Sequence, residues 1–505
     1  MVAADPRDVI YDMESYANVA TLSAKHAVSG TRWRFEYSHR VNQIPAMIDW
    51  LTALRSGGSR MVGFNNISFD YPVLHYILSD PTGVTPASIN AFVQRIINAD
   101  HSRRFDHIIW DRERYVEQVD LYKIHHFDNV ARATSLKVLE FNMRSQSIQD
   151  LPFAPGSVLG DAEIDELLRY NDHDVDKTEE FYYHTLPAIR FREELSAKYG
   201  RNFLNDNDTK IGKQYFIMRL EESLPGSCYC IGPDGKRQPR QTIREQIRLA
   251  DVIFPWIKFK RPEFTAVRDW LAAQVITETK GVFIDIPVER LGSLANYCTL
   301  KTNKRTGQVY AENLNVVVDG FQFDFGTGGI HGSVDSRILV TDDENILVDA
   351  DVTSFYPKLA IVNRVYPEHL SEVFCDIYSD VFEQRASYAK GTPENAMFKL
   401  ALNGVYGDSN NQYSPFYDPN YTMAITINGQ LLLCLLAENL MTIAGLEMIQ
   451  VNTDGVTVRL PRNQQDNFKM VCDWWQSHTL LQLEFANYAK FCVLNVNNYI
   501  AVYEE

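Results

Sequence analysis

Acidic residues recur at three places in the first third of the chain, in patterns that suit metal chemistry. The stretch VIYDMESY places Asp12 and Glu14 two residues apart in a strand-like run, so both carboxylates point to the same face. Asp70 begins an apolar helix-like stretch, and Tyr170 and Asp174 lie four residues apart in another, on one helical face. Carboxylates that converge in this way could hold two Mg²⁺ ions, which prefer oxygen ligands, and promote phosphodiester hydrolysis.

Each of these positions also has an ordinary structural interpretation. Asp70 by itself suits a helix N-cap, and the segment around Asp174 by itself suits a solvated acidic helix. We interpret His173, beside Asp174, as a helix-surface residue. The metal hypothesis therefore depends on the three positions taken together.

The order and spacing of the three motifs resemble those of the DEDD-type 3′–5′ exonucleases that carry a tyrosine in the third motif. The resemblance implies an RNase H-like domain with metal ligands at Asp12, Glu14, Asp70 and Asp174. It also implies that Tyr170 orients the attacking water, and that Asn65 and Phe69 contact an unpaired 3′ end.

Acidic residues recur in the last third at the end of a strand and in a hairpin. NILVDADVTSFYPKLAIVN reads as a buried strand that carries Asp349 and Asp351 on one face and breaks at Pro357. An acidic residue that ends an apolar strand is costly unless it is paired or bound to a cation. IQVNTDGVTVRL reads as a β-hairpin with Asp454-Gly455 as its turn, and by itself Asp454 is more simply a turn residue than a metal ligand.

Two helices are predicted between these stretches, over about 378–390 and 394–406. Thr392 suits the N-cap of the second helix, and Pro393 suits its first position. Three polar side chains share one face of this helix: Lys399, Asn403 and Tyr406. The alternative is a helical face simply left to water.

Three stretches resemble motifs A, B and C of the family B DNA polymerases: DVTSFYP from Asp351, KLALNGVYG from Lys399, and NTD from Asn452. They follow the exonuclease motifs in the order of that family. The resemblance implies template-directed extension of a primer 3′-OH with dNTPs on primer-template DNA, with 3′–5′ proofreading. It implies two Mg²⁺ ions per active site, with Mn²⁺ as an alternative, held in the polymerase half by Asp351 and Asp454.

The same resemblance assigns binding roles to further residues. The implied nucleotide-binding residues are Ser354, Tyr356, Arg385, Lys399 and Asn403. Tyr356 would exclude a 2′-OH, the group by which a protein tells RNA from DNA precursors. The implied DNA-binding residues, besides Asn65 and Phe69, are Gly328, Gly329, Tyr406, Gly407 and Tyr499.

The chain departs from the family pattern at three positions. Asn452 stands where motif C usually begins with Asp, Gly404 where motif B usually has Ser, and Asn497 where a lysine usually precedes the tyrosine of the last motif. We expect catalysis to survive, with altered handling of the metal or primer.

At 505 residues the chain is too long for one ordinary core, and the fold class expected is α/β and α+β multidomain. The expected divisions are an exonuclease domain over 1–190, a helical connector with the start of the palm over 191–325, palm with motif A over 326–364, fingers with motif B over 365–411, and antiparallel palm with motif C over 412–505. No thumb domain is expected, which predicts weak, salt-sensitive DNA binding unless a separate thumb-containing polypeptide takes part.

The net charge of −16 argues mildly against a DNA-coating protein. One segment is locally basic, and it is either a candidate DNA-backbone surface or a solvated helix face. Its basic residues are Lys236, Arg237, Arg240, Arg244, Arg248, Lys258, Lys260 and Arg261. Arg240, Arg244 and Arg248 recur there at helical spacing.

Seven scattered cysteines and no signal-like or membrane-length apolar run favour a cytoplasmic protein without a membrane partner. The minimal layout is similar to phage or viral replicative enzymes, whose place would be the host cytoplasm. The alternatives are an exonuclease with an inactive polymerase half and a non-catalytic DNA-binding subunit.

Overall fold

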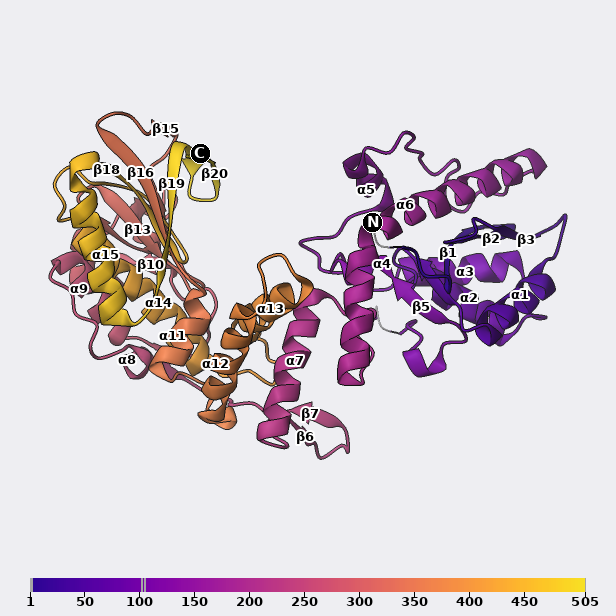
Figure 1. The fold of residues 1–505 in the computed structure, drawn as a ribbon, viewed down its shortest axis with the longest axis horizontal. Coiled ribbons are helices and arrows are strands. Elements are labelled where there is room, and N and C mark those ends of the chain that lie inside the picture. Colours follow the sequence, from indigo (N-terminus) through magenta and orange to yellow (C-terminus); the bar gives the residue numbers. More distant parts are fainter. Residues whose placement is uncertain (1–2, 101–102, 104–105, 505) are drawn as a thin grey trace. The chain divides into compact units, whose positions relative to one another are not determined.

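The computed structural model describes residues 3–100, 103 and 106–504 (Figure 1). The chain is mixed α/β and divides into two compact units, Met1–Ile211 and Gly212–Glu505. The expected boundary after residue 190 falls inside helix α6, Asp161–Tyr199. The two units are described separately below.

The N-terminal unit is built on a five-stranded sheet in the order β3-β2-β1-β4-β5. Its strands are β1 Asp8–Tyr16, β2 Val19–His26, β3 Arg32–Ser38, β4 Arg60–Gly63 and β5 Glu117–Asp120. The first three strands pair antiparallel, whereas β4 runs parallel to both β1 and β5.

Helices cover both faces of this sheet. Besides α6 they are α1 Ile44–Ser56, α2 Asp70–Ser79, α3 Pro86–Ile97, α4 Leu121–Ile124 and α5 Leu136–Met143. Along β1, Tyr11 and Met13 pack in one core with α1, α2 and α3, whereas Ile10 packs in a second core with α6. Because strand side chains alternate, Asp12 and Glu14 continue the face that α6 covers.

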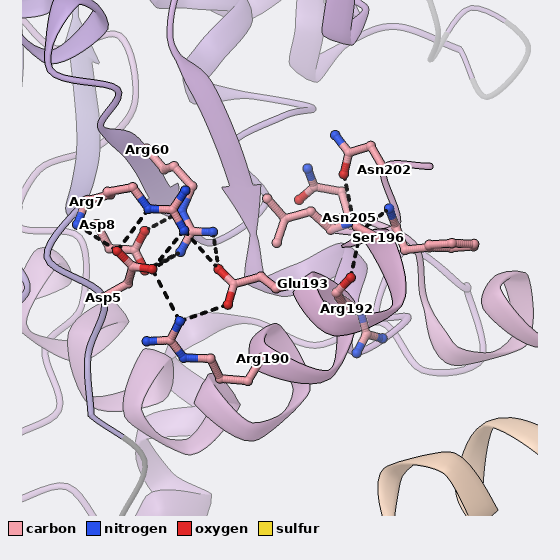
Figure 2. A network of polar contacts seen from close by, with 12 residues as sticks. Asp5, Arg7, Asp8, Arg60, Arg190, Arg192, Glu193, Ser196, Asn202 and Asn205 are labelled. Carbon is pink, nitrogen blue, oxygen red and sulfur yellow. Dashed lines mark hydrogen bonds and ion pairs between the residues drawn. The ribbon is translucent and has the colours of Figure 1, made fainter. Parts of the chain in front are cut away.

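A buried ion-pair network joins the sheet to α6 (Figure 2). The Arg60 guanidinium at the start of β4 is only 2% exposed and donates to both Asp8 oxygens, at 2.6 and 2.9 Å. Arg60 also pairs with Glu193 of α6, to which Arg190 donates at 2.9 Å. The network fixes the ends of β1 and β4 on α6, the helix that carries Asp174.

The C-terminal unit contains an 11-stranded sheet in which every pairing is antiparallel. Its main path runs β10-β12-β13-β14-β17-β18-β16-β19-β15, with β11 on β12 and β20 on β19. The strands are β10 Ile284–Pro287, β11 Lys301–Thr302, β12 Val309–Val318, β13 Phe321–Phe325, β14 Ile330–Ser333, β15 Arg337–Val340, β16 Asn345–Val352, β17 Glu447–Asn452, β18 Gly455–Pro461, β19 Leu483–Asn495 and β20 Asn498–Tyr503. The sheet thus begins before residue 326, within the stretch expected to be a helical connector.

The helices of this unit include the two predicted finger helices and a long core helix. They are α7 Asp208–Ser223, within which the division between the units falls, α8 Leu249–Val252, α9 Pro262–Ala272, α10 Val288–Leu291, α11 Phe355–Asn363, α12 Val373–Ala386, α13 Pro393–Gly407, α14 Pro419–Leu440 and α15 Gln465–Thr479. The N-cap of α13 is Thr392, as predicted, and its hydroxyl accepts the Asn395 N–H. The unit also contains two small antiparallel pairs: β6 Tyr229–Ile231 with β7 Arg237–Pro239, and β8 Ile247–Arg248 with β9 Val275–Ile276, which α8 and α9 separate in the sequence.

By length and composition α14 could cross a membrane, but 94% of its apolar window is buried inside the fold. It packs against α8, α11 and α15, and the Trp475 indole of α15 donates to the Leu432 carbonyl at 2.9 Å. A core helix buried on all sides is apolar all round, so its place in the core accounts for its composition.

The helix indicated by the spacing of Arg240, Arg244 and Arg248 is not present in this described stretch of the chain. Residues 240–246 form neither helix nor strand. The Arg244 side chain donates to Asp418, the N-cap residue of α14, at 2.9 Å, and also pairs with Glu368. A guanidinium held by a buried carboxylate positions a loop, so Arg244 is no simple phosphate contact.

We predict that Arg60→Ala lowers the free energy of unfolding by about 3–5 kcal/mol, because Asp8, 0% exposed, is left as an unpaired buried charge. Chemical denaturation followed by circular dichroism measures the change. The matched control is Arg112→Ala, whose side chain is 83% exposed and which should shift stability by at most about 0.5 kcal/mol. Equal denaturation midpoints for the two variants would contradict the prediction.

Candidate active sites

The N-terminal unit gathers the predicted exonuclease carboxylates. One ligand oxygen each of Asp12, Glu14 and Asp174 lie within 4.8 Å of one another. The Asp70 carboxylate accepts the backbone N–H of Met13, between the two β1 carboxylates, at 3.1 Å. Asp70 is the first residue of α2 and the N-cap position belongs to Phe69, so the capping interpretation of Asp70 is wrong.

Burial and mutual repulsion govern the protonation of these groups. Burial, followed by the negative charges of the neighbouring carboxylates, raises the pKa of Asp12 and Glu14 well above their usual values. Burial raises the pKa of Asp70 and of Asp174 to about 7. Among the described residues, the leading charges behind these shifts are carboxylates rather than lysine or arginine. An oxygen-only donor set that lacks a positive partner fits a hard divalent cation.

The other predicted exonuclease residues lie beside this cluster. Tyr170 lies one helical turn before Asp174 on α6, and burial, followed by the negative charge of that carboxylate, raises the pKa of the Tyr170 hydroxyl. Phe69 and Glu14 line the same cavity, of about 180 Å³. Asn65 has a left-handed backbone, with φ 63°, and its N–H donates to the buried carboxylate of Asp120 at 3.0 Å. Asp120 thus holds the loop that leads into α2.

Sequence reasoning missed Asn171 and misjudged His173. The Asn171 amide donates to Asp12 Oδ2 at 2.7 Å and accepts the Thr21 hydroxyl at 3.1 Å. Its spacing of three residues from Asp174 on α6 could have indicated this shared face. His173 is not a surface residue: its side chain is 9% exposed and its Nε2 lies 3.2 Å from the buried Glu140 carboxylate.

In the C-terminal unit, Asp351 and the hairpin aspartate come together through strand register. Asp351 near the end of β16 lies opposite Gly455 of β18, which also pairs with Asn452 of β17. The turn residues are therefore Thr453 and Asp454, and the predicted Asp454-Gly455 turn is wrong. A Cβ on Gly455 would lie 1.7 Å from Asp351 Oδ1, so glycine is needed there because the carboxylate lies against its backbone.

All seven predicted catalytic and nucleotide-binding residues of this unit line one cavity of about 800 Å³. They are Asp351, Ser354, Tyr356, Arg385, Lys399, Asn403 and Asp454. The Arg385 guanidinium donates to Ser354 Oγ at 3.2 Å. The cavity therefore combines carboxylates with cationic side chains, which is the charge pattern needed to bind metal ions and a polyphosphate together.

Most of the predicted DNA-contact residues of this unit lie around a neighbouring cavity of about 720 Å³. Gly328, Tyr406 and Gly407 line it. Tyr356 joins the two cavities, because its hydroxyl donates to the Gly328 carbonyl at 2.8 Å and its ring lies 4.5 Å from that of Tyr406. A Cβ on Gly329 would meet Thr453 at 3.3 Å, so this glycine loop packs against the hairpin turn.

Tyr499 lies outside the described lining of both cavities. It stands on β20, 44% exposed, with its ring stacked 5.1 Å from Phe491. Burial, followed by the negative charges of Asp349, Asp351 and Asp454, raises the Tyr499 pKa. It therefore lies on the carboxylate side of the sheet without entering the cavity.

The carboxylates of the C-terminal unit repel one another as those of the N-terminal unit do. Burial, followed by the charges of Asp349 and Asp454, raises the pKa of Asp351 to about 7, and burial raises the pKa of Asp454. Glu484 of β19 lies directly opposite Asp351 and lines the cavity. Sequence reasoning missed Glu484, because only the register of β19 on β16 brings it there.

No protein-family model matches this sequence, and no curated protein matches it. Among solved structures, the chain is similar to the family B DNA polymerase from the hyperthermophilic archaeon Pyrobaculum calidifontis, with 13% sequence identity and a TM-score of 0.48. The alignment covers 98% of this chain and 59% of that one. The chain thus spans less than two thirds of the length of that polymerase.

We predict that the metal-free chain loses stability as the pH rises. The folded-state pKa values of Asp70 and Asp174, about 7, lie above their unfolded values, so the folded state binds more protons between about pH 4 and pH 7 and unfolding becomes easier through that window. In EDTA, the melting temperature should be higher at about pH 5 than at about pH 8. Mg²⁺ should raise the melting temperature at the higher pH.

The control for this prediction is the Asp12→Asn, Asp174→Asn variant, which carries two fewer titrating carboxyls. Its melting temperature should fall less between the same two pH values. A metal-free wild type that melts at a higher temperature at the higher pH would contradict the prediction.

Proposed function

We propose that this chain is a template-directed DNA polymerase with a 3′–5′ proofreading exonuclease, of the family B type, acting in phage or viral DNA replication. The observation that carries the proposal is the cavity in which Asp351 and Asp454 meet Lys399 and Arg385. Carboxylates alone would suit many metal sites, but carboxylates and cations in one cavity suit a metal-bound nucleoside triphosphate.

The residues of the C-terminal unit would divide the work of nucleotidyl transfer. Asp351 and Asp454 would hold two Mg²⁺ ions, which when bound stabilise charge on the attacking and leaving oxygens. Lys399 and Arg385 would bind the triphosphate, whose oxygens are strong acceptors for charged donors. Tyr356, fixed by the Gly328 carbonyl and Tyr406, would bound the sugar pocket.

The N-terminal unit would remove mispaired 3′ ends. Asp12, Glu14, Asp70 and Asp174 would hold the ions, and Tyr170, one helical turn from Asp174 on α6, would orient the attacking water. The cavity lined by Phe69 beside Glu14 offers an apolar surface for an unpaired base. The mixed sheet, three antiparallel strands followed by two parallel ones, supports the RNase H-like interpretation.

The position of Asn452 favours an active polymerase half over an inactive one. Asn452 is outside the described lining of the cavity that holds Asp351 and Asp454. Its amide oxygen instead lies 3.3 Å from Thr453 Oγ1, in the hairpin turn. Asn452 would therefore affect the support of the turn more than the binding of metal.

We predict that a substitution in either site abolishes one activity and leaves the other intact. On a 5′-labelled primer-template with Mg²⁺, Asp454→Ala should abolish extension with dNTPs and retain primer shortening without dNTPs. Asp174→Ala should do the reverse, because its carboxylate belongs to the other unit. Gel electrophoresis measures both reactions. Primer shortening without any extension by the wild-type chain would favour an exonuclease with an inactive polymerase half, and neither reaction would favour a DNA-binding subunit.

Removal of the Tyr356 ring should relax sugar selection. In Tyr356→Ala, incorporation of ribonucleotides relative to deoxynucleotides should rise about tenfold or more, equivalent to ~1.4 kcal/mol of lost discrimination. Tyr356→Phe is the matched control, since it loses the bond to Gly328 and keeps the ring. A ratio of the two kcat/KM values that is unchanged in Tyr356→Ala would contradict this role.

A further inference from the structure

Asp349 is a carboxylate of β16 to which the proposed reaction gives no role. Its Oδ1 accepts the Thr457 hydroxyl at 2.5 Å, and its Oδ2 accepts the Tyr488 hydroxyl at 3.1 Å. Thr457 and Tyr488 belong to β18 and β19, the strands on either side of β16. Asp349 is thus held by both neighbouring strands, two residues before Asp351 on β16.

The position of Asp349 is unfavourable for an ordinary structural residue. Asp349 and Asp351 lie two residues apart on β16 and share a face of that strand. Among the described contacts of Asp349, the two side-chain hydrogen bonds come from Thr457 and Tyr488. Its two hydrogen bonds come from neutral hydroxyls, which orient a carboxylate without neutralising it. A second negative charge beside Asp351 therefore favours the binding of a cation there.

We propose that Asp349 is a positioning residue of the cation site: held by Thr457 and Tyr488, it orients Asp351 and adds a further carboxylate charge that increases divalent-cation affinity. The inference rests on the proposed function for the reaction that the cations serve. The cation site itself can be tested without that reaction.

Direct cation binding separates this role from a merely structural one. The experiment uses the full chain carrying Asp12→Asn and Asp174→Asn, so that the N-terminal cluster is weakened, and follows free Mn²⁺ by electron paramagnetic resonance. Asp349→Asn should raise the Mn²⁺ dissociation constant about tenfold or more, as removal of an outer-sphere partner of a metal ligand does. Tyr488→Phe keeps the ring and loses only the brace, so its rise should be smaller, about two- to tenfold.

The matched control is Asp343→Asn, an exposed aspartate in the loop before β16, which should leave the Mn²⁺ dissociation constant unchanged. If Asp349→Asn and Tyr488→Phe both bind Mn²⁺ as the parent does, the inference is overturned. It is also overturned if Asp349→Asn weakens binding only together with a fall in melting temperature and Tyr488→Phe has no effect.

Catalysis gives a second measurement in chains with an intact N-terminal cluster. Asp349→Asn should raise the Mg²⁺ concentration for half-maximal primer extension by about tenfold, while saturating Mg²⁺ restores most of the rate. Exonuclease activity serves as the folding control. If the wild type fails to extend primers and Asp349→Asn still weakens Mn²⁺ binding, the proposed function fails and the cation-site role of Asp349 stands.

Discussion

Asp12, Glu14 and Asp174 bring ligand oxygens within 4.8 Å of one another, and the repulsion between them is a cost that the rest of the N-terminal unit must offset. The fold offsets this repulsion by holding the elements that carry the carboxylates rigidly in place. Two hydrophobic cores fix β1 between helices on opposite faces, and the buried Arg60 network ties β1 and β4 to α6. Carboxylates on such elements cannot relax apart, so protonation or a bound cation is needed to relieve their repulsion.

The C-terminal unit meets the same constraint by different local means. Asp351 ends a strand in the middle of a broad antiparallel sheet, and Asp454 lies in a two-residue turn. Gly455 leaves the space that the Asp351 carboxylate occupies. Thr453 has a φ of 57°, a strained value for a β-branched residue, which the packing of the glycine loop against it helps to hold. Strain of this kind is found where a structure over-determines a functional turn.

The errors of sequence reasoning have a common physical cause. His173 and Arg244 are polar side chains that by themselves favour solvent, yet in the fold they pair with Glu140 and Asp418, which are distant in sequence. Asp454-Gly455 matches a common turn signal, yet the turn is formed by Thr453 and Asp454, because Gly455 pairs with Asp351 in the sheet. Each local pattern favours one structure, but a contact with a residue distant in sequence can favour another.

The sequence by itself determined the elements that carry the carboxylates: β1, the start of α2, the α6 segment around Asp174, β16 and the hairpin. Their periodicity is local, and so is the N-cap at Thr392. Only the tertiary structure decided which further groups surround them. Asn171 meets Asp12 across α6 and β1, and Glu484 meets Asp351 through strand register. Register and helix packing are set by contacts between residues distant in sequence, and no local pattern specifies them.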